Sequence, residues 1–123
     1  MQERRQFVRL DTRLDASYTV LATGVASRTQ TKNVGGGGIC LITDEVFAPG
    51  TRLQFVLKLP DVEQSVRFVG EVVWSEPYEI IGKTERRRAV EAGVRFVEIS
   101  PADREAVMRH VILNLPSTHP SVP

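Results

Sequence analysis

Three arginines, Arg4, Arg5 and Arg9, stand close together near the start of the chain. Residues four positions apart point the same way on a helical turn and on an extended strand, so Arg5 and Arg9 can face one ligand. A guanidinium group is a planar fork of donors that binds phosphate oxygens in pairs, fits the O6 and N7 edge of guanine, and stacks on flat rings. An anionic purine nucleotide would use all three properties.

A second segment, residues 33–38, reads Asn-Val-Gly-Gly-Gly-Gly and precedes an apolar stretch at 39–42. Glycine loses more backbone freedom on folding than other residues, so a run of four indicates either positive φ or a close approach of the backbone to something. A bulge or sharp barrel turn and a ligand contact both stay open. The run is not a nucleotide phosphate loop, because no Lys-Ser/Thr and no helix follow it, and Leu41 replaces the last glycine of a dinucleotide fingerprint.

The 123 residues fit one domain, and the net charge of +1 gives no global attraction to nucleic acid or to an acidic membrane. The single cysteine, Cys40, lies in an apolar stretch and is expected to be a small buried residue in a reducing cytoplasm. No apolar stretch has membrane-spanning length. With two histidines, one cysteine and no clustered carboxylates, we expect no metal site, no bound cofactor and no enzymatic activity.

Alternation with period two and many β-branched residues predict about six short strands, mostly sequential and antiparallel, which favours a mainly β fold, a small barrel or a sandwich. The last two are expected to form a long hairpin, separated by a polar stretch that contains Pro77 and the charge run 85–88, which is expected to be a solvated loop. The predicted strands cover roughly residues 16–21, 27–32, 39–43, 53–59, 66–74 and 92–99.

A helix is predicted over 100–115, because Ser100 supplies an N-cap hydroxyl, Pro101 suits the first helical position and Asp103 follows the cap by three residues. Its buried stripe is expected at Met108, Val111, Ile112 and Leu115. His110 is expected to be half-buried or exposed, without an evident partner. Residues 117–123 are expected to form a flexible tail.

Together the two segments resemble the PilZ domain, a bacterial receptor module for cyclic di-GMP (c-di-GMP). Its pattern is Arg-x-x-x-Arg on an N-terminal arm, followed by Asp/Asn-x-Ser-x-x-Gly. Arg5 and Arg9 match the arginines, Asn33 and Gly38 match the ends of the second motif, and Gly35 replaces its serine. The resemblance covers roughly residues 3–115. It implies a single domain over 1–116: an arm at 1–13, a six-stranded antiparallel PilZ-type β-barrel at 14–99 and the C-terminal helix.

The resemblance also implies roles for these residues. Arg5 and Arg9 would bind phosphates and guanine edges, Asn33 would accept a hydrogen bond from a guanine N–H, and Gly38 would let the backbone approach. An additional arginine just before the motif accompanies two stacked copies of the ligand in family members, and Arg4 holds that position. Trp74 would stack on a base as an aromatic does in some relatives, although a lone Trp beside Val72 and Val73 is more often a core residue.

The function implied is a c-di-GMP receptor that orders its arginine arm and signals to a protein partner. The first alternative is a degenerate PilZ-like module that binds protein and not nucleotide, motivated by Gly35. The second is a binder of RNA or single-stranded DNA, which the sparse aromatics and the near-zero net charge disfavour.

Overall fold

The computed structural model describes residues 9–84 and 86–115, which form seven strands and one helix. The elements are β1 (Arg9–Asp11), β2 (Asp15–Val20), β3 (Ala26–Gly35), β4 (Gly38–Thr43), β5 (Arg52–Leu57), β6 (Val66–Ile81), β7 (Arg86–Ile99) and α1 (Pro101–Asn114).

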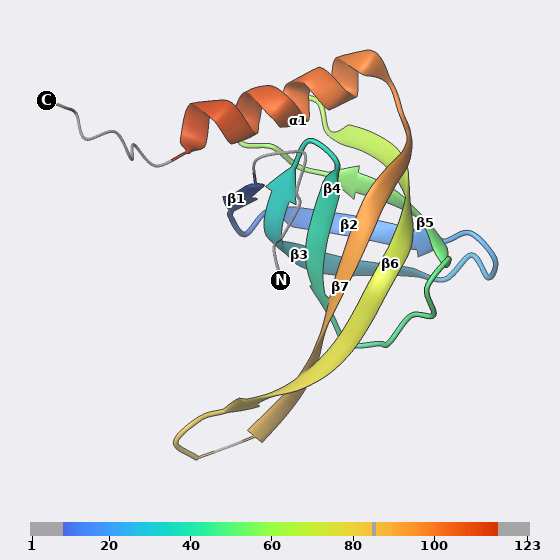
Figure 1. Ribbon diagram of the computed structural model, residues 1–123, viewed down its shortest axis with the longest axis vertical. Coiled ribbons are helices and arrows are strands. Elements are labelled where there is room, and N and C mark those ends of the chain that lie inside the picture. Colours follow the sequence, from blue (N-terminus) through green and yellow to red (C-terminus); the bar gives the residue numbers. More distant parts are fainter. Residues whose placement is uncertain (1–8, 85, 116–123) are drawn as a thin grey trace, which may run out of the picture.

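Six of these strands close into a barrel in the order β3, β2, β5, β6, β7, β4 and back to β3, and every neighbouring pair is antiparallel (Figure 1). Closure removes the exposed edges that an open sheet would leave. β1 adds a short seventh strand along β3, beyond the part of β3 that pairs with β2. The mainly β fold, the six-stranded barrel and the C-terminal helix are confirmed.

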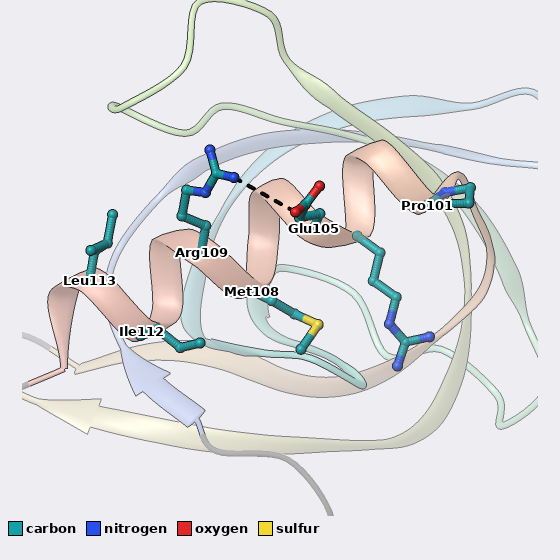
Figure 2. A pocket seen from close by; sticks show the side chains of 7 residues that line it. Pro101, Glu105, Met108, Arg109, Ile112 and Leu113 are labelled. Carbon is teal, nitrogen blue, oxygen red and sulfur yellow. Dashed lines mark ion pairs between the residues drawn. The ribbon is translucent and has the colours of Figure 1, made fainter.

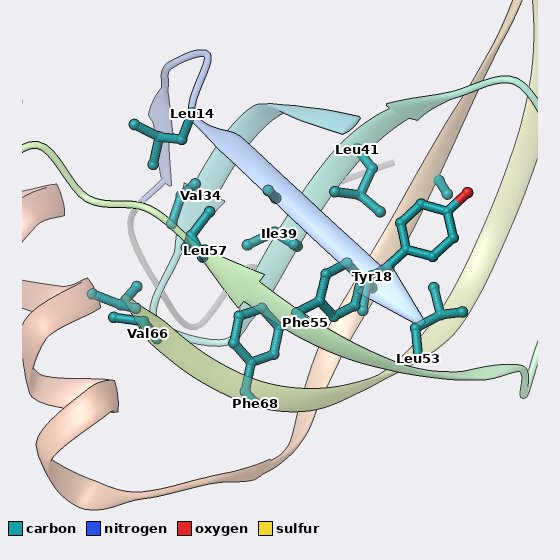
Figure 3. Close-up of a cluster of buried hydrophobic side chains, with 14 of the residues drawn as sticks. Leu14, Tyr18, Val34, Ile39, Leu41, Leu53, Phe55, Leu57, Val66 and Phe68 are labelled. Carbon is teal, nitrogen blue, oxygen red and sulfur yellow. The ribbon is translucent and has the colours of Figure 1, made fainter. Parts of the chain in front are cut away.

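The barrel is filled by alternate residues of each strand, because successive side chains of a strand point to opposite faces. Figure 3 shows this cluster, in which Phe55 and Phe68 stack at a ring-centroid distance of 4.9 Å. Phe68 also meets the edge of Phe96 at 4.7 Å. Cys40 is buried, as expected.

The helix α1 begins as predicted: the Ser100 hydroxyl accepts a hydrogen bond from the backbone N–H of Asp103 at 3.1 Å, and Pro101 occupies the first turn. It lies over one end of the barrel and contacts β1, β3 and β6 (Figure 1).

The predicted buried stripe of α1 is right at Val111 and at Leu115, which packs partly buried against the core, and wrong at Met108 and Ile112. Val107, His110 and Val111 are buried, whereas Met108 and Ile112 are exposed. The i, i+3, i+4 spacing indicated one stripe, but large apolar residues lie on more than one side of this helix, so the spacing could not indicate which side meets the barrel.

The expectation for His110 is also wrong, because its side chain is only 4% exposed. Its Nδ1 atom lies 2.8 Å from a carboxylate oxygen of Asp61, which is 49 positions away in the loop between β5 and β6. A partner so distant in sequence leaves no local signal. The contact ties the helix to the turn that follows β5.

The last two strands are longer than predicted and project from the barrel as a two-stranded ribbon (Figure 1). β6 runs through Pro77, which pairs with Val90, and β5 accompanies β6 only as far as Glu71. Val72 still hydrogen-bonds to the backbone of Gly50 and Thr51. Farther along, no strand of the described chain pairs with this edge of β6, and proline is tolerated there because its missing N–H can face solvent. Arg87 and Arg88 are exposed residues of β7 and not of a loop.

Candidate ligand-binding site

β1 joins the arginine arm to the glycine-rich segment. Leu10 is buried, so its neighbours in this strand, Arg9 and Asp11, point the opposite way, toward the outside of the barrel. Arg9 pairs with Gly35 and Asp11 with Asn33, and the Nη1 atom of Arg9 donates a hydrogen bond to Oδ1 of Asn33 at 2.7 Å. Two residues predicted for one site from separate motifs are therefore in direct contact.

The other two arginines of the arm, Arg4 and Arg5, lie outside the described residues. Both precede β1 directly in the chain. Their expected contribution to the site stays a prediction.

Gly38 is buried at the start of β4, opposite Arg95 of β7. A β-carbon at this position would overlap the carbonyl oxygen of Val94 and come within 2.9 Å of the Cα atom of Arg95. The sequence left two reasons for the glycine run, positive φ or close approach. At Gly38 the reason is close approach, and the approaching group is the protein's own β7 backbone, since the positive-φ glycines of the described chain are Gly24 and Gly50.

Gly35, at the serine position of the motif, is a buried residue at the end of β3. It faces Arg9 across the β1–β3 pair. A side chain placed here would start beside the residues that hold the Arg9–Asn33 hydrogen bond.

Trp74 is 42% exposed, so the more common expectation, a core tryptophan, is wrong. The register of β6 and β7 shifts between Val72 and Trp74, so that Val73 is exposed as well. The indole lies against Gly93, because a β-carbon added to that glycine would overlap the ring. The ring is thus held on the outer surface, where a base could stack on it.

These residues lie in register across four adjacent strands. Asn33 of β3 pairs with Cys40 of β4, Cys40 with Gly93 of β7, and Gly93 with Trp74 of β6. Neighbouring strands are about 4.8 Å apart, so three steps place the Asn33 and Trp74 backbones roughly 14 Å from each other. We call this row the ligand face. It has a hydrogen-bonding end at Arg9 and Asn33, and an aromatic end at Trp74.

Two ion pairs beside the ligand face were not singled out from the sequence. The Lys32 ammonium lies 2.7 Å from the Glu91 carboxylate, and hydrogen bonding and charge attraction from Glu91 raise the pKa of Lys32. Arg95, opposite Gly38, lies 2.7 Å from Glu71. The position of Lys32 next to Asn33 in the sequence could have indicated Lys32. No such signal exists for Arg95, which is brought beside the ligand face only by the pairing of β4 with β7.

The chemistry available at the ligand face is that of binding. It offers guanidinium donors, an amide and an exposed indole, a set suited to phosphate, guanine edges and flat rings. Among the described residues no three His, Cys, Asp or Glu side chains converge as a metal site would require. Within the same residues no helix has the length and apolar character to cross a membrane.

Comparison with known proteins identifies the family to which the chain belongs. The family model for the PilZ domain matches residues 3–113. The Bacillus subtilis protein YpfA is 27% identical over 116 residues, which cover 89% of this chain and 49% of YpfA. The chain thus spans about half the length of this curated relative.

The fold is shared with several solved structures. The PilZ domain of YcgR from Escherichia coli, solved with c-di-GMP, superposes with a TM-score of 0.74 at 17% identity over 90% of this chain and 91% of that one. The inhibitor of motility MotI/DgrA from Bacillus subtilis gives 0.67 at 25% identity, covering 91% of this chain and 51% of that one.

The complex of MrkH from K. pneumonia with c-di-GMP gives a TM-score of 0.73 at 16% identity, covering 91% of this chain and 51% of that one. These likenesses extend over the barrel and the helix. The family match over residues 3–113 shows that the chain belongs to the PilZ domain family, which includes receptors for c-di-GMP.

Proposed function

We propose that this chain is a c-di-GMP receptor, with the ligand bound on the face between Arg9 and Trp74. The observation that carries the proposal is the hydrogen bond from Arg9 to Asn33, supported by the β1–β3 pairing, because it brings the two ligand motifs of the family together on one surface. The ligand combines phosphates with guanine rings, and this face offers groups that recognise both.

Each site residue has a role in this proposal. Arg5 and Arg9 bind the phosphates and the O6 and N7 edges of guanine, and Asn33 accepts a hydrogen bond from a guanine N–H. Trp74 stacks on a base. Gly35 adds no side chain beside Arg9, so the ligand can approach the backbone there, whereas the space at Gly38 is filled by the backbone of β7.

The stoichiometry in this proposal is two ligands per chain, stacked on each other. Arg4 supplies the additional guanidinium group next to the motif, and its stacking on a purine would contribute roughly 0.5–2 kcal/mol. Arg4→Ala is therefore expected to reduce the number of ligands bound from two to one, without abolishing binding.

The proposed output is a conformational change of the arm that a partner protein reads. Phosphates neutralise the repulsion between neighbouring arginines, so the ligand stabilises one arm conformation over others. The arm leads directly into β1, which contacts α1, so its position affects the surface around that end of the barrel. The partner would bind this surface only with ligand present.

Isothermal titration of the full chain with c-di-GMP tests the proposal, with GTP as the specificity control and Arg5→Ala/Arg9→Ala as the site variant. We expect micromolar or tighter binding that is absent for GTP and lost in the double variant. Lys83→Ala, which removes an exposed cation in the loop between β6 and β7, is the matched control and should bind like the wild type. Absence of binding to the wild-type chain at millimolar ligand would refute the receptor function.

One observation favours a second function, a PilZ-like module that binds a protein and no nucleotide. Gly38 is required by the packing of β4 on β7, and Gly35 lacks the motif's hydroxyl, so part of the glycine segment has a purely structural explanation. Gly35→Ser separates the two functions. In a receptor the restored hydroxyl should tighten binding by up to about tenfold, since such a hydrogen bond contributes roughly 0.5–1.5 kcal/mol. If the chain is instead a module that binds protein and no nucleotide, the Gly35→Ser variant should not bind c-di-GMP either.

A further inference from the structure

The outer side of α1 carries an exposed apolar row that the ligand face does not use. Met108 is 37% exposed and Ile112 63% exposed, and both project from the same flank of the helix (Figure 2). A shallow groove of about 500 Å³ runs along this side. Large apolar side chains exposed together on one helix face mark an interaction surface more often than isolated ones do.

Together with Pro101 and Glu105, these two apolar residues have the spacing of a helix-pairing seam. Pro101, Glu105, Met108 and Ile112 are separated by four, three and four residues, the repeat that presents one narrow stripe to a second helix. His110, almost opposite this stripe, is buried against the barrel. The seam therefore lies on the exposed side of α1, where a helix of another molecule could pack along it.

The charges on the seam select both the orientation and the partner. Glu105 and Arg109 form an ion pair within the helix at 3.7 Å (Figure 2). Both side chains are more than half exposed, so this pair is weak, and either residue can instead pair with an oppositely charged residue of another molecule. Two such helices aligned parallel would place like charges together. Aligned antiparallel, with Pro101 level with Ile112 of the other copy, Glu105 comes within about 1.5 Å, one residue's rise, of the level of the other Arg109.

We propose that the occupant of this face is a second copy of the chain, joined through an antiparallel α1–α1 contact with two-fold symmetry. Each copy supplies Met108 and Ile112 to the apolar centre, and each Glu105 pairs with Arg109 of the other copy. A two-fold interface must be self-complementary, and this face carries both halves of its own ion pair. The contact is independent of the ligand face and of the proposed function.

The dimer is expected to be weak. A helix of 14 residues is about 21 Å long, and one face of it offers less than the roughly 800 Å² per partner of a standard interface. We therefore expect dissociation at about 1 µM and substantial dimer at about 0.5 mM.

Sedimentation equilibrium of the full chain over that concentration range is the experiment. Glu105→Arg places arginine against Arg109 of the other copy, and Arg109→Glu places glutamate against Glu105, so each variant alone should be monomeric. Mixed in equal amounts, the two variants should form a heterodimer, because one copy then carries two arginines and the other two glutamates. Mixing does not restore the Glu105–Arg109 pair within either helix. A heterodimer can therefore form only through charge pairs between the two copies.

Circular dichroism and thermal unfolding of both variants confirm that the helix is intact before the mixing experiment. A milder variant, Met108→Ser, should weaken the dimer at least tenfold while keeping all charges. A monomeric wild-type chain at 0.5 mM would overturn the proposal and indicate another occupant, such as the chain's own ends or a different protein. Dimerisation of the single variants at wild-type strength, or a mixture that stays monomeric, would overturn it as well.

Discussion

Single residues determine the shape of the ligand face, and glycine does so at two positions for different physical reasons. At Gly38 the space for a β-carbon is taken by the β7 backbone, which cannot move without opening the barrel. At Gly93 the space is taken by the Trp74 ring, which can rotate away. The same substitution should therefore have different consequences at the two sites.

Gly38→Ala is expected to lower the free energy of unfolding by about 2–3 kcal/mol or more, since overpacking against fixed backbone is costly. Gly93→Ala should cost less stability but displace the indole, and so weaken c-di-GMP binding. Urea unfolding and isothermal titration of both variants measure the two effects. Equal losses of stability in both would show that Trp74 is as fixed as the backbone.

Trp74→Ala should reduce affinity for c-di-GMP by about 5- to 150-fold, because stacking of an aromatic side chain on a base contributes roughly 1–3 kcal/mol. Stability should change little, since the side chain is 42% exposed. Val73→Ala, its exposed neighbour, is the control and should bind normally. Trp74 is the single tryptophan of the chain, so ligand should also alter the intrinsic fluorescence of the wild type. An unchanged dissociation constant in Trp74→Ala would exclude stacking.

At the scale of elements, the seating of α1 on the barrel depends on a polar contact as well as on apolar packing. Val107 and Val111 complete the core at this end, and the His110–Asp61 pair holds the helix to the turn after β5. The other ring nitrogen of His110, Nε2, is buried without a hydrogen-bond partner among the described residues. The ring thus depends on Asp61 and Asn114 for its polar contacts.

Asp61→Ala is expected to lower the free energy of unfolding by about 1–3 kcal/mol, because it leaves the buried Nδ1 atom of His110 without its carboxylate. Glu63→Ala removes an exposed acid of the same loop and should have an effect below about 0.5 kcal/mol. Urea unfolding at neutral pH compares the two. A loss in Asp61→Ala no greater than that of the control would show that the contact adds nothing to the docking of α1.

At the scale of the whole molecule, the barrel and the ribbon are separable. β5 pairs with β6 up to Glu71, and β4 pairs with β7 from Val90 onward, so residues 78–81 of β6 and 86–89 of β7 are paired only with each other. The hydrophobic core lies entirely within the barrel and beneath α1. The tip of the ribbon is therefore not needed for closure.

Replacing residues 79–88 by Asn-Gly joins Tyr78 to Ala89 through a two-residue hairpin turn. The shortened chain should fold, with a free energy of unfolding within about 1 kcal/mol of the wild type, and should bind c-di-GMP as the full chain does. Urea unfolding and titration calorimetry provide both values. Loss of the folded state would mean that the ribbon contributes to the barrel beyond the pairs described.

Much of this protein was determined by its sequence alone, where the signal is local. Period-two alternation identified the six strands of the barrel, but neither β1 nor the full length of β6 and β7. Ser100 and Pro101 located the start of α1, and the spacing of motifs around Arg9 and Asn33 identified the family. These signals depend on a residue's immediate neighbours, because side-chain alternation and helix capping act within a few positions.

Only the tertiary structure determined which of these residues are in contact with one another. The β1–β3 pairing brought Arg9 to Asn33, the bulge in β6 turned Trp74 outward, and the loop after β5 supplied Asp61 to His110. The face of α1 that meets the barrel, and hence the exposed face that includes Met108, was likewise settled by packing. Such contacts join residues that are tens of positions apart in the sequence. They form only when the whole barrel closes, and a pattern of neighbouring residues does not indicate which distant residues will meet.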